Sequence, residues 1–262
     1  MRSVPRRLAL VVALAAIVAF PATAVANHSW NGYHWARQAN PFVLKVGDNL
    51  SSSWKGYLKT AASDWSKSTV LDMTVVAGGS SNKQCRPTAG RDEVCNGAYG
   101  FNGWLGIAQV WVSGKHITQG TTKVNDTYFN TSTYNSSAWR QLVMCQEVGH
   151  TIGLDHQDEN FSNANLGTCM DYTNDPDGGA GGASSSDPGN LHPNKHDYDE
   201  LVAIYKHLDS TTTVGSAVAS VADARWNAEW GREVARSAGG HVSTYVRDLG
   251  GENLVFTFVI WA

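Results

Sequence analysis

The residues whose types and spacing could do chemistry lie between Gln146 and His156, in the order Gln-Glu-Val-Gly-His-Thr-Ile-Gly-Leu-Asp-His. Residues four apart share one face of a helix, so Gln146 and His150 would point the same way. Glu147 would lie beside them, where a carboxylate can hold and deprotonate a metal-bound water. Gly153 permits a sharp turn that returns His156 to the same metal. The pattern predicts a metal-dependent hydrolytic site with Glu147 as general base.

This stretch resembles the metzincin clan of zinc endopeptidases, whose pattern is H-E-x-x-H-x-x-G-x-x-H followed by a Met-turn. A matching second element, Cys169-Met170-Asp171-Tyr172, starts 13 residues after His156. The resemblance covers about residues 40–209 and implies Zn2+ as cofactor, with His150 and His156 as ligands. It further implies that Met170 forms a floor under the metal. Tyr172 resembles the tyrosine that astacins and serralysins place near the metal to assist the oxyanion.

One position departs from the clan's pattern, because Gln146 stands where the family has His. A Gln side chain offers zinc only a neutral amide oxygen, which is a weaker donor than imidazole. Three interpretations stay open: Gln146 ligates weakly, a substitute ligand replaces it, or the chain is an inactive relative. The nearest candidates for a substitute are His116, Asp155 and Asp158. The leading hypothesis is a secreted zinc endopeptidase, and the alternative is a catalytically inactive, metzincin-like secreted binding protein.

The first 26 residues predict an export signal. Arg2, Arg6 and Arg7 precede an apolar run over 8–20, and Ala24-Val25-Ala26 forms a small-residue cleavage site. The apolar run is too short to span a bilayer comfortably. We expect cleavage after Ala26, secretion, and no membrane segment thereafter.

The 262-residue chain has 20 Lys plus Arg against 23 Asp plus Glu, and loss of the signal's three Arg changes its formal charge from −3 to −6. Because basic clusters are lacking outside the signal, we expect no nucleic-acid partner. The hypothesis implies a protein or peptide substrate and a monomer.

Export makes disulfides the expected state of the four cysteines, which allow three pairings. Cys85 with Cys95 is favoured, because the loop between them holds Pro87 and Gly90 and can fold back on itself. Cys145 and Cys169 then remain. A site of four thiolates on zinc is the alternative, but the short Cys-x-x-Cys spacing is absent. Under the resemblance, the second bridge ties the active-site helix to the Met-turn.

The elements that must position these residues alternate between strands and helices. Periodicity and turn residues predict strand 42–46, helix 51–67, strand 70–77, strands 104–113 and 120–125, helix 138–153, helix 196–208, and strand-like pieces 241–247 and 254–261. The early strand, helix, strand unit favours parallel pairing. The resemblance implies an α+β fold: a mixed, mostly parallel twisted sheet with an active-site helix, a Met-turn and a C-terminal helix.

The predicted segments are a signal peptide (1–26), a metzincin-like metallopeptidase domain (27–209), a linker (210–224) and a small C-terminal β segment (225–262). The clan binds peptides extended beside an edge strand, which the resemblance places near 104–112. Trp104 and Trp111 are therefore candidates to line a substrate cleft.

Histidines outside the motif have simpler interpretations. His196 precedes a helix start at which capping by Asn194 or Asp197 explains the polar cluster. We expect the remaining lone histidines to be surface or loop residues; these are His28, His34, His192 and His207.

Overall fold

The structure is a computed structural model that describes residues 28–179, 186–216 and 230–262. The predicted signal 1–26 lies outside the described residues, as do residues 217–224 of the predicted linker. The division into segments therefore stays a prediction. Within the described ranges, no helix combines the length and the apolar composition that crossing a membrane requires.

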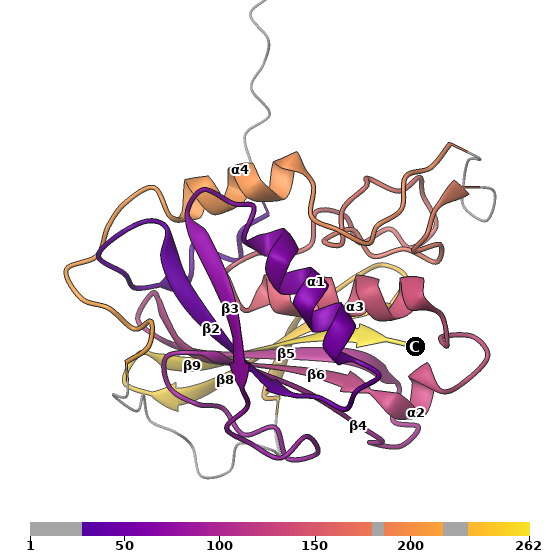
Figure 1. Ribbon diagram of the computed structural model, residues 1–262, viewed down its shortest axis with the longest axis horizontal. Helices are drawn as coiled ribbons and strands as arrows, with labels where there is room; N and C mark the ends of the chain where they lie inside the picture. Colours follow the sequence, from indigo (N-terminus) through magenta and orange to yellow (C-terminus); the bar gives the residue numbers. More distant parts are fainter. Residues whose placement is uncertain (1–27, 180–185, 217–229) are drawn as a thin grey trace, which may run out of the picture.

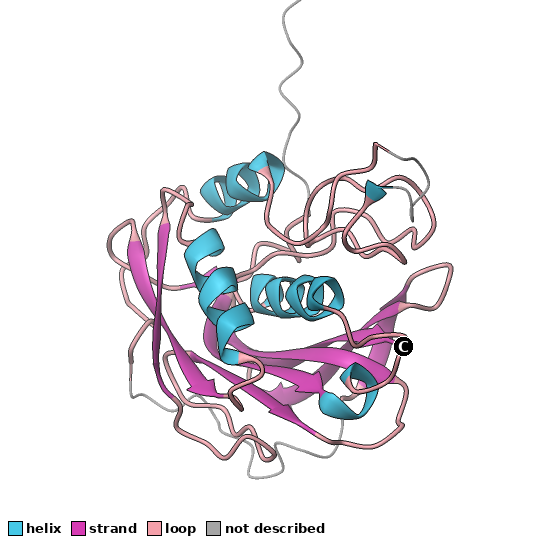
Figure 2. Cartoon of the chain, turned by 45° about the vertical axis from the view of Figure 1, so that its right-hand side comes forward, coloured by secondary structure: helices cyan, strands magenta, loops and turns pink. Residues whose placement is uncertain are grey.

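A nine-stranded sheet carries helices α1, α3 and α4 on one side, as Figures 1 and 2 show. The strand order is β3-β2-β4-β6-β5-β9-β8-β7, and β1 pairs with β6 outside this path. The strands are β1 (His34–Trp35), β2 (Phe42–Asn49), β3 (Leu71–Ala77), β4 (Asp92–Gly97), β5 (Trp104–Ser113), β6 (His116–Asn125), β7 (Arg232–Arg236), β8 (Val242–Gly250) and β9 (Asn253–Trp261). The helices are α1 (Lys55–Trp65), α2 (Asp126–Phe129), α3 (Ser137–His150) and α4 (Lys195–Ile204).

The sheet has a parallel half and an antiparallel half. Strand pairs β1–β6, β2–β3, β2–β4 and β4–β6 are parallel. Pairs β5–β6, β5–β9, β7–β8 and β8–β9 are antiparallel. The predicted α+β fold with a mixed sheet is confirmed. Parallel pairs do not dominate, because the C-terminal strands join the same sheet and add an antiparallel half.

Helix α1 packs against α3, so the hydrophobic core continues from one helix to the other. Its predicted apolar face is buried, including Leu58 and Trp65. The indole N–H of Trp65 donates to the carbonyl of Cys145 on α3 at 3.1 Å. The helix starts at Lys55, later than predicted, because the preceding residues from Ser51 form a turn.

Strand β4 is absent from the predicted elements. Its sequence Asp-Glu-Val-Cys-Asn-Gly has few of the branched and aromatic residues that mark strands. All of its residues are nevertheless buried, because β4 lies between β2 and β6. Neighbouring strands, rather than local propensity, decide this segment.

The expectation of an edge strand over 104–112 is wrong. Strand β5 pairs with β6 on one side and with β9 on the other, so it is an interior strand. Trp104 and Trp111 are buried rather than lining an open cleft. The physical reason is that the C-terminal strand supplies the second row of backbone hydrogen bonds, which the resemblance alone leaves unpaired.

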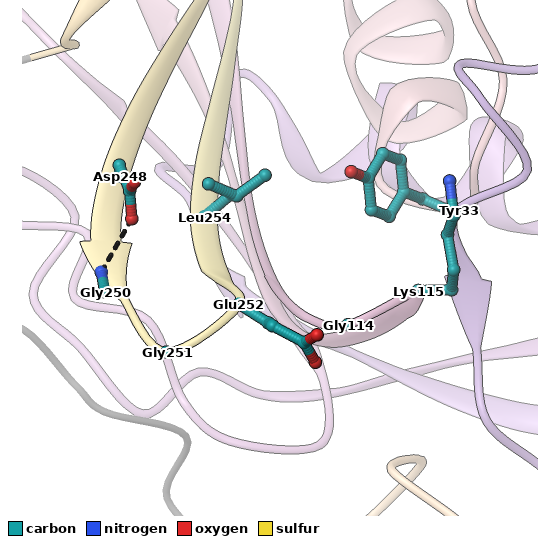
Figure 3. A pocket seen from close by; sticks show the side chains of 8 residues that line it. All are labelled: Tyr33, Gly114, Lys115, Asp248, Gly250, Gly251, Glu252 and Leu254. Carbon is teal, nitrogen blue, oxygen red and sulfur yellow. Dashed lines mark hydrogen bonds between the residues drawn. The ribbon is translucent and has the colours of Figure 1, made fainter.

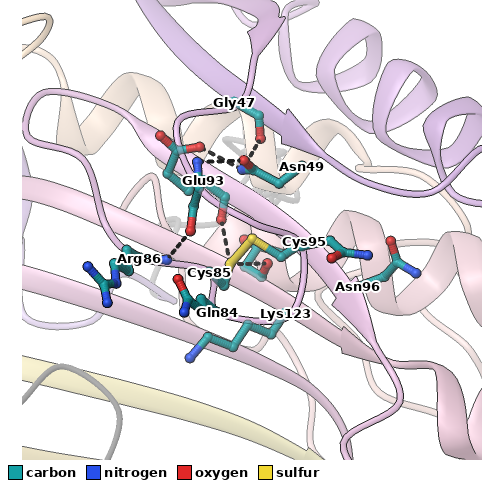
Figure 4. The surroundings of a disulfide bond; sticks show 12 residues. Gly47, Asn49, Gln84, Cys85, Arg86, Glu93, Cys95, Asn96 and Lys123 are labelled. Carbon is teal, nitrogen blue, oxygen red and sulfur yellow. Dashed lines mark hydrogen bonds between the residues drawn. A yellow bond between two sulfur atoms is a disulfide. The ribbon is translucent and has the colours of Figure 1, made fainter.

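Both predicted disulfides are present, Cys85–Cys95 and Cys145–Cys169. Figure 4 shows the first beside the network of Glu93 and Asn49, whose side chains are hydrogen-bonded at 2.6 Å. Cys85 and Cys95 are fully buried, because Cys95 belongs to β4. This bridge therefore fastens the partly exposed loop between the two cysteines to the interior of the sheet.

Replacing Cys145 and Cys169 together by Ala should lower the free energy of unfolding by roughly 3.5 kcal/mol, because a longer unfolded loop gains more entropy when released. The sequence separation is 24 for this bridge and 10 for Cys85–Cys95. The matched Cys85/Cys95 double variant should lose slightly less, about 3 kcal/mol. Urea unfolding of the three proteins measures the difference; an unchanged midpoint for the first variant would contradict the restraint.

Candidate metal centre

Helix α3 carries the first three residues of the predicted site near its end. It begins after Ser136, whose side chain accepts a hydrogen bond from the backbone N–H of Trp139. Gln146, Glu147 and His150 all have an exposed fraction of 0%. The polar part of the motif is therefore placed inside the protein.

Three aromatic side chains hold the turn that follows α3. The indole N–H groups of Trp30 and Trp35 and the hydroxyl of Tyr205 donate to the carbonyls of residues 150, 151 and 152, at 3.2, 2.8 and 2.9 Å. Carbonyls at a helix end lack partners within the helix, so these donors stabilise the turn. Tryptophan is expected in the core from its residue type alone. No spacing in the sequence indicates that Trp30 and Trp35 contact the motif.

Gly153 allows the chain to reverse after α3. Its φ is +100°, and a Cβ built there would lie 2.5 Å from the carbonyl oxygen of Tyr33. Only Gly combines this dihedral angle with so close a backbone approach. The turn then brings His156 back towards His150.

Replacing Gly153 by Ala should destabilise the protein by more than the roughly 1–2 kcal/mol that a left-handed residue costs. The excess comes from the clash with the Tyr33 carbonyl. Gly32→Ala is the control, because φ is +69° there and no heavy atom lies within 4 Å of its Cβ. Thermal unfolding measures both variants. Equal losses would show that the close approach to Tyr33 has no energetic effect.

The rings of His150 and His156 each have an oxygen atom near Nδ1. Their centroids are 4.6 Å apart. The Nδ1 of His150 lies 2.9 Å from the carbonyl oxygen of Leu154, and the Nδ1 of His156 lies 3.3 Å from Glu159 Oε1 and 3.5 Å from Asp155 Oδ1. The carbonyl beside Nδ1 of His150 favours a hydrogen there, which leaves the lone pair on Nε2. The two carboxylates near His156 favour its protonated ring, so a metal at its Nε2 would displace a proton.

Several buried polar atoms of the motif have no hydrogen-bond partner among the described residues. They are both amide atoms of Gln146, the Nε2 atom of His150 and both ring nitrogens of His156. Such atoms are rare in proteins, so their gathering on one motif requires an explanation. The carboxylate of Glu147 is buried beside them, with the backbone N–H of Ala108 as a hydrogen-bonding neighbour. Two imidazole nitrogens are ordinary zinc donors, the amide oxygen of Gln146 would be a weaker third donor, and the adjacent carboxylate would hold a water molecule.

The environment shifts the protonation of these groups strongly. Burial raises the pKa of Glu147 well above its ordinary value. Burial, followed by the imidazole of His156, lowers the pKa of His150 to about 3. Burial also acts to lower the pKa of His156, but Asp155 and Glu159 outweigh it and raise that pKa to about 9. A cation beside Glu147 would favour its ionised form and so oppose the effect of burial.

Met170 lies against the last turn of α3. It is fully buried, and a Cβ built at Gly149 would lie 2.5 Å from its sulfur. The adjacent Cys169 is bonded to Cys145 of α3, and the carbonyl of Met170 accepts a hydrogen bond from the N–H of Gln157 at 2.6 Å. The disulfide and these contacts fix the predicted Met-turn to the helix.

Gly106 of β5 belongs to the site, although it is not among the predicted site residues. A Cβ built there would lie 2.5 Å from Oε1 of Glu147 and 2.6 Å from Cγ1 of Val143. The absent side chain therefore lets α3 approach β5 with the Glu147 carboxylate between them. No local signal in the sequence distinguishes this glycine from its neighbours.

Strand β9 covers the site. The ring of Phe258 stacks on His150 with centroids 4.3 Å apart and planes 7° apart. The hydroxyl of Tyr172 donates to the backbone carbonyl of Trp261 at 3.0 Å. His156 keeps an exposed fraction of only 9%. In this conformation a peptide substrate cannot reach the motif.

No family model matches the chain, and no curated protein matches it. Among solved structures, it is similar to high choriolytic enzyme 1, a hatching enzyme zinc-protease from Oryzias latipes (medaka fish). The two share 13% sequence identity and a TM-score of 0.36, over 68% of this chain and 96% of that chain.

The three candidate substitute ligands, Asp155, Asp158 and His116, have different surroundings. Asp155 faces Nδ1 of His156, on the side of the ring away from the free Nε2. Asp158 accepts a hydrogen bond from the backbone N–H of Asn160 at 2.8 Å. His116 lies 3.3 Å from the carboxylate of Asp209, in a separate cluster. Asp155 therefore contacts a motif histidine only at Nδ1, and Gln146 stays the proposed third metal ligand.

Two of the lone histidines are buried; His28 lies in a loop as expected, whereas His34 lies on strand β1. His28 and His34 are each only 5% exposed. His28 stacks on His196 and its Nδ1 lies 2.8 Å from the carbonyl oxygen of Asp155, so it packs beneath the motif's turn. The capping role predicted for Asn194 and Asp197 at the start of α4 is confirmed by a reciprocal capping box.

A pocket of about 520 Å³ lies away from these residues (Figure 3). It is formed by the β5–β6 and β8–β9 turns, and its lining residues are Tyr33, Gly114, Lys115, Asp248, Gly250, Gly251, Glu252 and Leu254. The pocket therefore contains none of the predicted site residues.

Proposed function

We propose that this chain is a zinc-dependent endopeptidase of the metzincin type, in which Gln146, His150 and His156 hold the metal. The observation that carries the proposal is the set of buried motif atoms without partners. The proposal includes secretion after cleavage of the signal at Ala26, a protein or peptide substrate, and a monomeric protein. The disulfides are compatible with an oxidising compartment.

The side chains divide the work of hydrolysis. Zinc, when bound, would supply Lewis-acid polarisation of the carbonyl that is cleaved. Glu147 would accept the proton of the attacking water and pass it to the leaving amine. Tyr172 would donate its hydroxyl hydrogen to the substrate's carbonyl oxygen, as it does to the peptide carbonyl of Trp261.

Strand β9 takes the place beside β5 in which the clan binds extended peptides. We infer that the conformation described here is latent and that hydrolysis requires β9 to move away. The ring of Phe258 over His150 is the main obstacle at the metal ligands.

A specific observation favours the second candidate, an inactive binding protein. Gln146, Glu147 and His150 are fully buried. Gln146 is also the weakest of the three proposed metal ligands, because an amide oxygen binds zinc less well than imidazole. A chain that never opens would keep the motif only as packing. In that case its polar atoms would stay unpartnered at a cost in stability.

Casein digestion by the purified secreted protein, with and without a chelator, separates the two candidates. The proposal predicts digestion that the chelator abolishes and that added zinc restores. A Gln146→His variant should bind zinc more tightly, because imidazole is the better donor. Zinc-free protein that digests nothing, even after Gln146→His, would support the binding protein instead.

A further inference from the structure

Four potential ligands from distant parts of the chain meet outside the motif. His34 lies on β1 and His116 begins β6, and they are register partners in the parallel β1–β6 pair. His207 and Asp209 follow α4. The cluster therefore brings together strand β1, strand β6 and the segment that follows α4.

The donor atoms of His34, His116 and Asp209 all lie within 4.8 Å of one another, and His207 lies beside two of them. Asp209 Oδ1 lies 3.5 Å from His34 Nε2, 3.3 Å from His116 Nε2 and 3.5 Å from His207 Nε2. The Nε2 atoms of His34 and His207 are 3.1 Å apart. Four ligands at the 2.0–2.1 Å that zinc prefers are separated from one another by about 3.3 Å.

The same distances fit poorly with an ordinary ion-pair cluster. A charge-assisted hydrogen bond from a protonated imidazole to a carboxylate is usually about 2.7–2.9 Å long. All three separations to Asp209 Oδ1 exceed this. The Nε2 atoms of His34 and His207 are within hydrogen-bond distance at 3.1 Å, so a metal ion would replace the hydrogen bond between the two rings.

Neighbouring groups prepare two of the four ligands. The Nδ1 of His34 lies 2.8 Å from the carbonyl oxygen of Gly32, which leaves its Nε2 as the free lone pair. Asp209 accepts hydrogen bonds at Oδ2 from Nη1 and the backbone N–H of Arg37, at 2.7 and 3.1 Å. Its Oδ1 therefore remains directed at the three imidazoles.

We propose that His34, His116, His207 and Asp209 form a second zinc site with a structural role. Four protein ligands leave no open position for a substrate, as in structural zinc sites. The side chains of His116 and His207 are 36% and 46% exposed, so a metal ion can enter from solvent. The inference is independent of the proposed peptidase function, because no motif residue takes part.

The test uses the full secreted chain with His150→Gln, which removes a ligand of the motif. Titration with Co2+ should produce the intense visible absorption of a tetrahedral cobalt site, and Zn2+ should raise the midpoint of thermal unfolding. Adding His116→Ala and His207→Ala should abolish both effects and lower the bound zinc by one equivalent. His192→Ala is the matched control, because His192 is exposed and paired with Asp64 outside the cluster.

The His150→Gln protein keeps all four cluster residues. Absence of the cobalt spectrum in this protein would therefore overturn the inference. So would an unchanged zinc content after the two cluster substitutions, or an equal loss in the His192→Ala control. None of these results depends on peptide hydrolysis. Failure of the second zinc site and failure of the peptidase proposal are thus distinguishable.

Discussion

Glu147→Gln lowers the rate of peptide hydrolysis by roughly 10²–10⁴-fold, the contribution of a positioned general base. The amide keeps the size of the carboxyl in a space bounded by Gly106, but it cannot accept the water's proton. Bound zinc should stay unchanged, because Glu147 is not one of the proposed ligands. The measurement is the turnover of a fluorogenic peptide together with the zinc content of each protein.

Glu159→Gln tests the charge around His156, since Glu159 lies 3.3 Å from the Nδ1 of that proposed ligand and its side chain is 43% exposed. It should lose less activity than Glu147→Gln, because Asp155 still faces the same Nδ1. Full activity in the Glu147→Gln protein would remove this residue from the chemistry. Equal losses in the two variants would mean that the charge around His156, and not proton transfer, limits the reaction.

Phe258→Ala raises the rate of peptide hydrolysis, because it removes the ring stacked on His150 and weakens the strand that covers the site. Truncating a buried Phe costs about 3 kcal/mol or more. If that loss falls on the covered state alone, the open fraction grows roughly a hundredfold. The same variant should release zinc to a chelator faster than the wild type.

Phe256→Ala separates uncovering from general loosening of β9. Phe256 lies two residues away on the same strand, and its ring packs on Trp30 and Tyr33 rather than on a proposed metal ligand. It should change activity much less than Phe258→Ala. Identical rates for Phe258→Ala and the wild type, with both folded, would show that β9 does not limit access.

The sequence predicts the elements around the motif well, because their signals are local. Apolar spacing at Leu58 and Trp65 predicts α1, and the cap at Ser136 predicts the start of α3. The strand predicted over 254–261 is observed as β9. Periodicity identifies such a strand, but it does not say which neighbour the strand pairs with.

The pairing of β9 with β5 is the main feature that local patterns could not supply. Because of it, Trp104 belongs to the interior instead of a cleft, and Phe258 reaches His150. The support from Trp30 and Trp35 to the motif's turn depends likewise on contacts more than 100 residues apart. The residue types of the candidate site are readable in sequence, whereas their covering and their supports are properties of the tertiary fold.

The most direct test of the metal centre is the amount of zinc bound by the wild type and by His150→Gln, each equilibrated with the same free zinc. The substitution removes one proposed ligand and leaves the four residues of the separate cluster unchanged. The metal centre proposed here predicts that the variant binds one equivalent less per chain. Equal zinc content in the two folded proteins would contradict it.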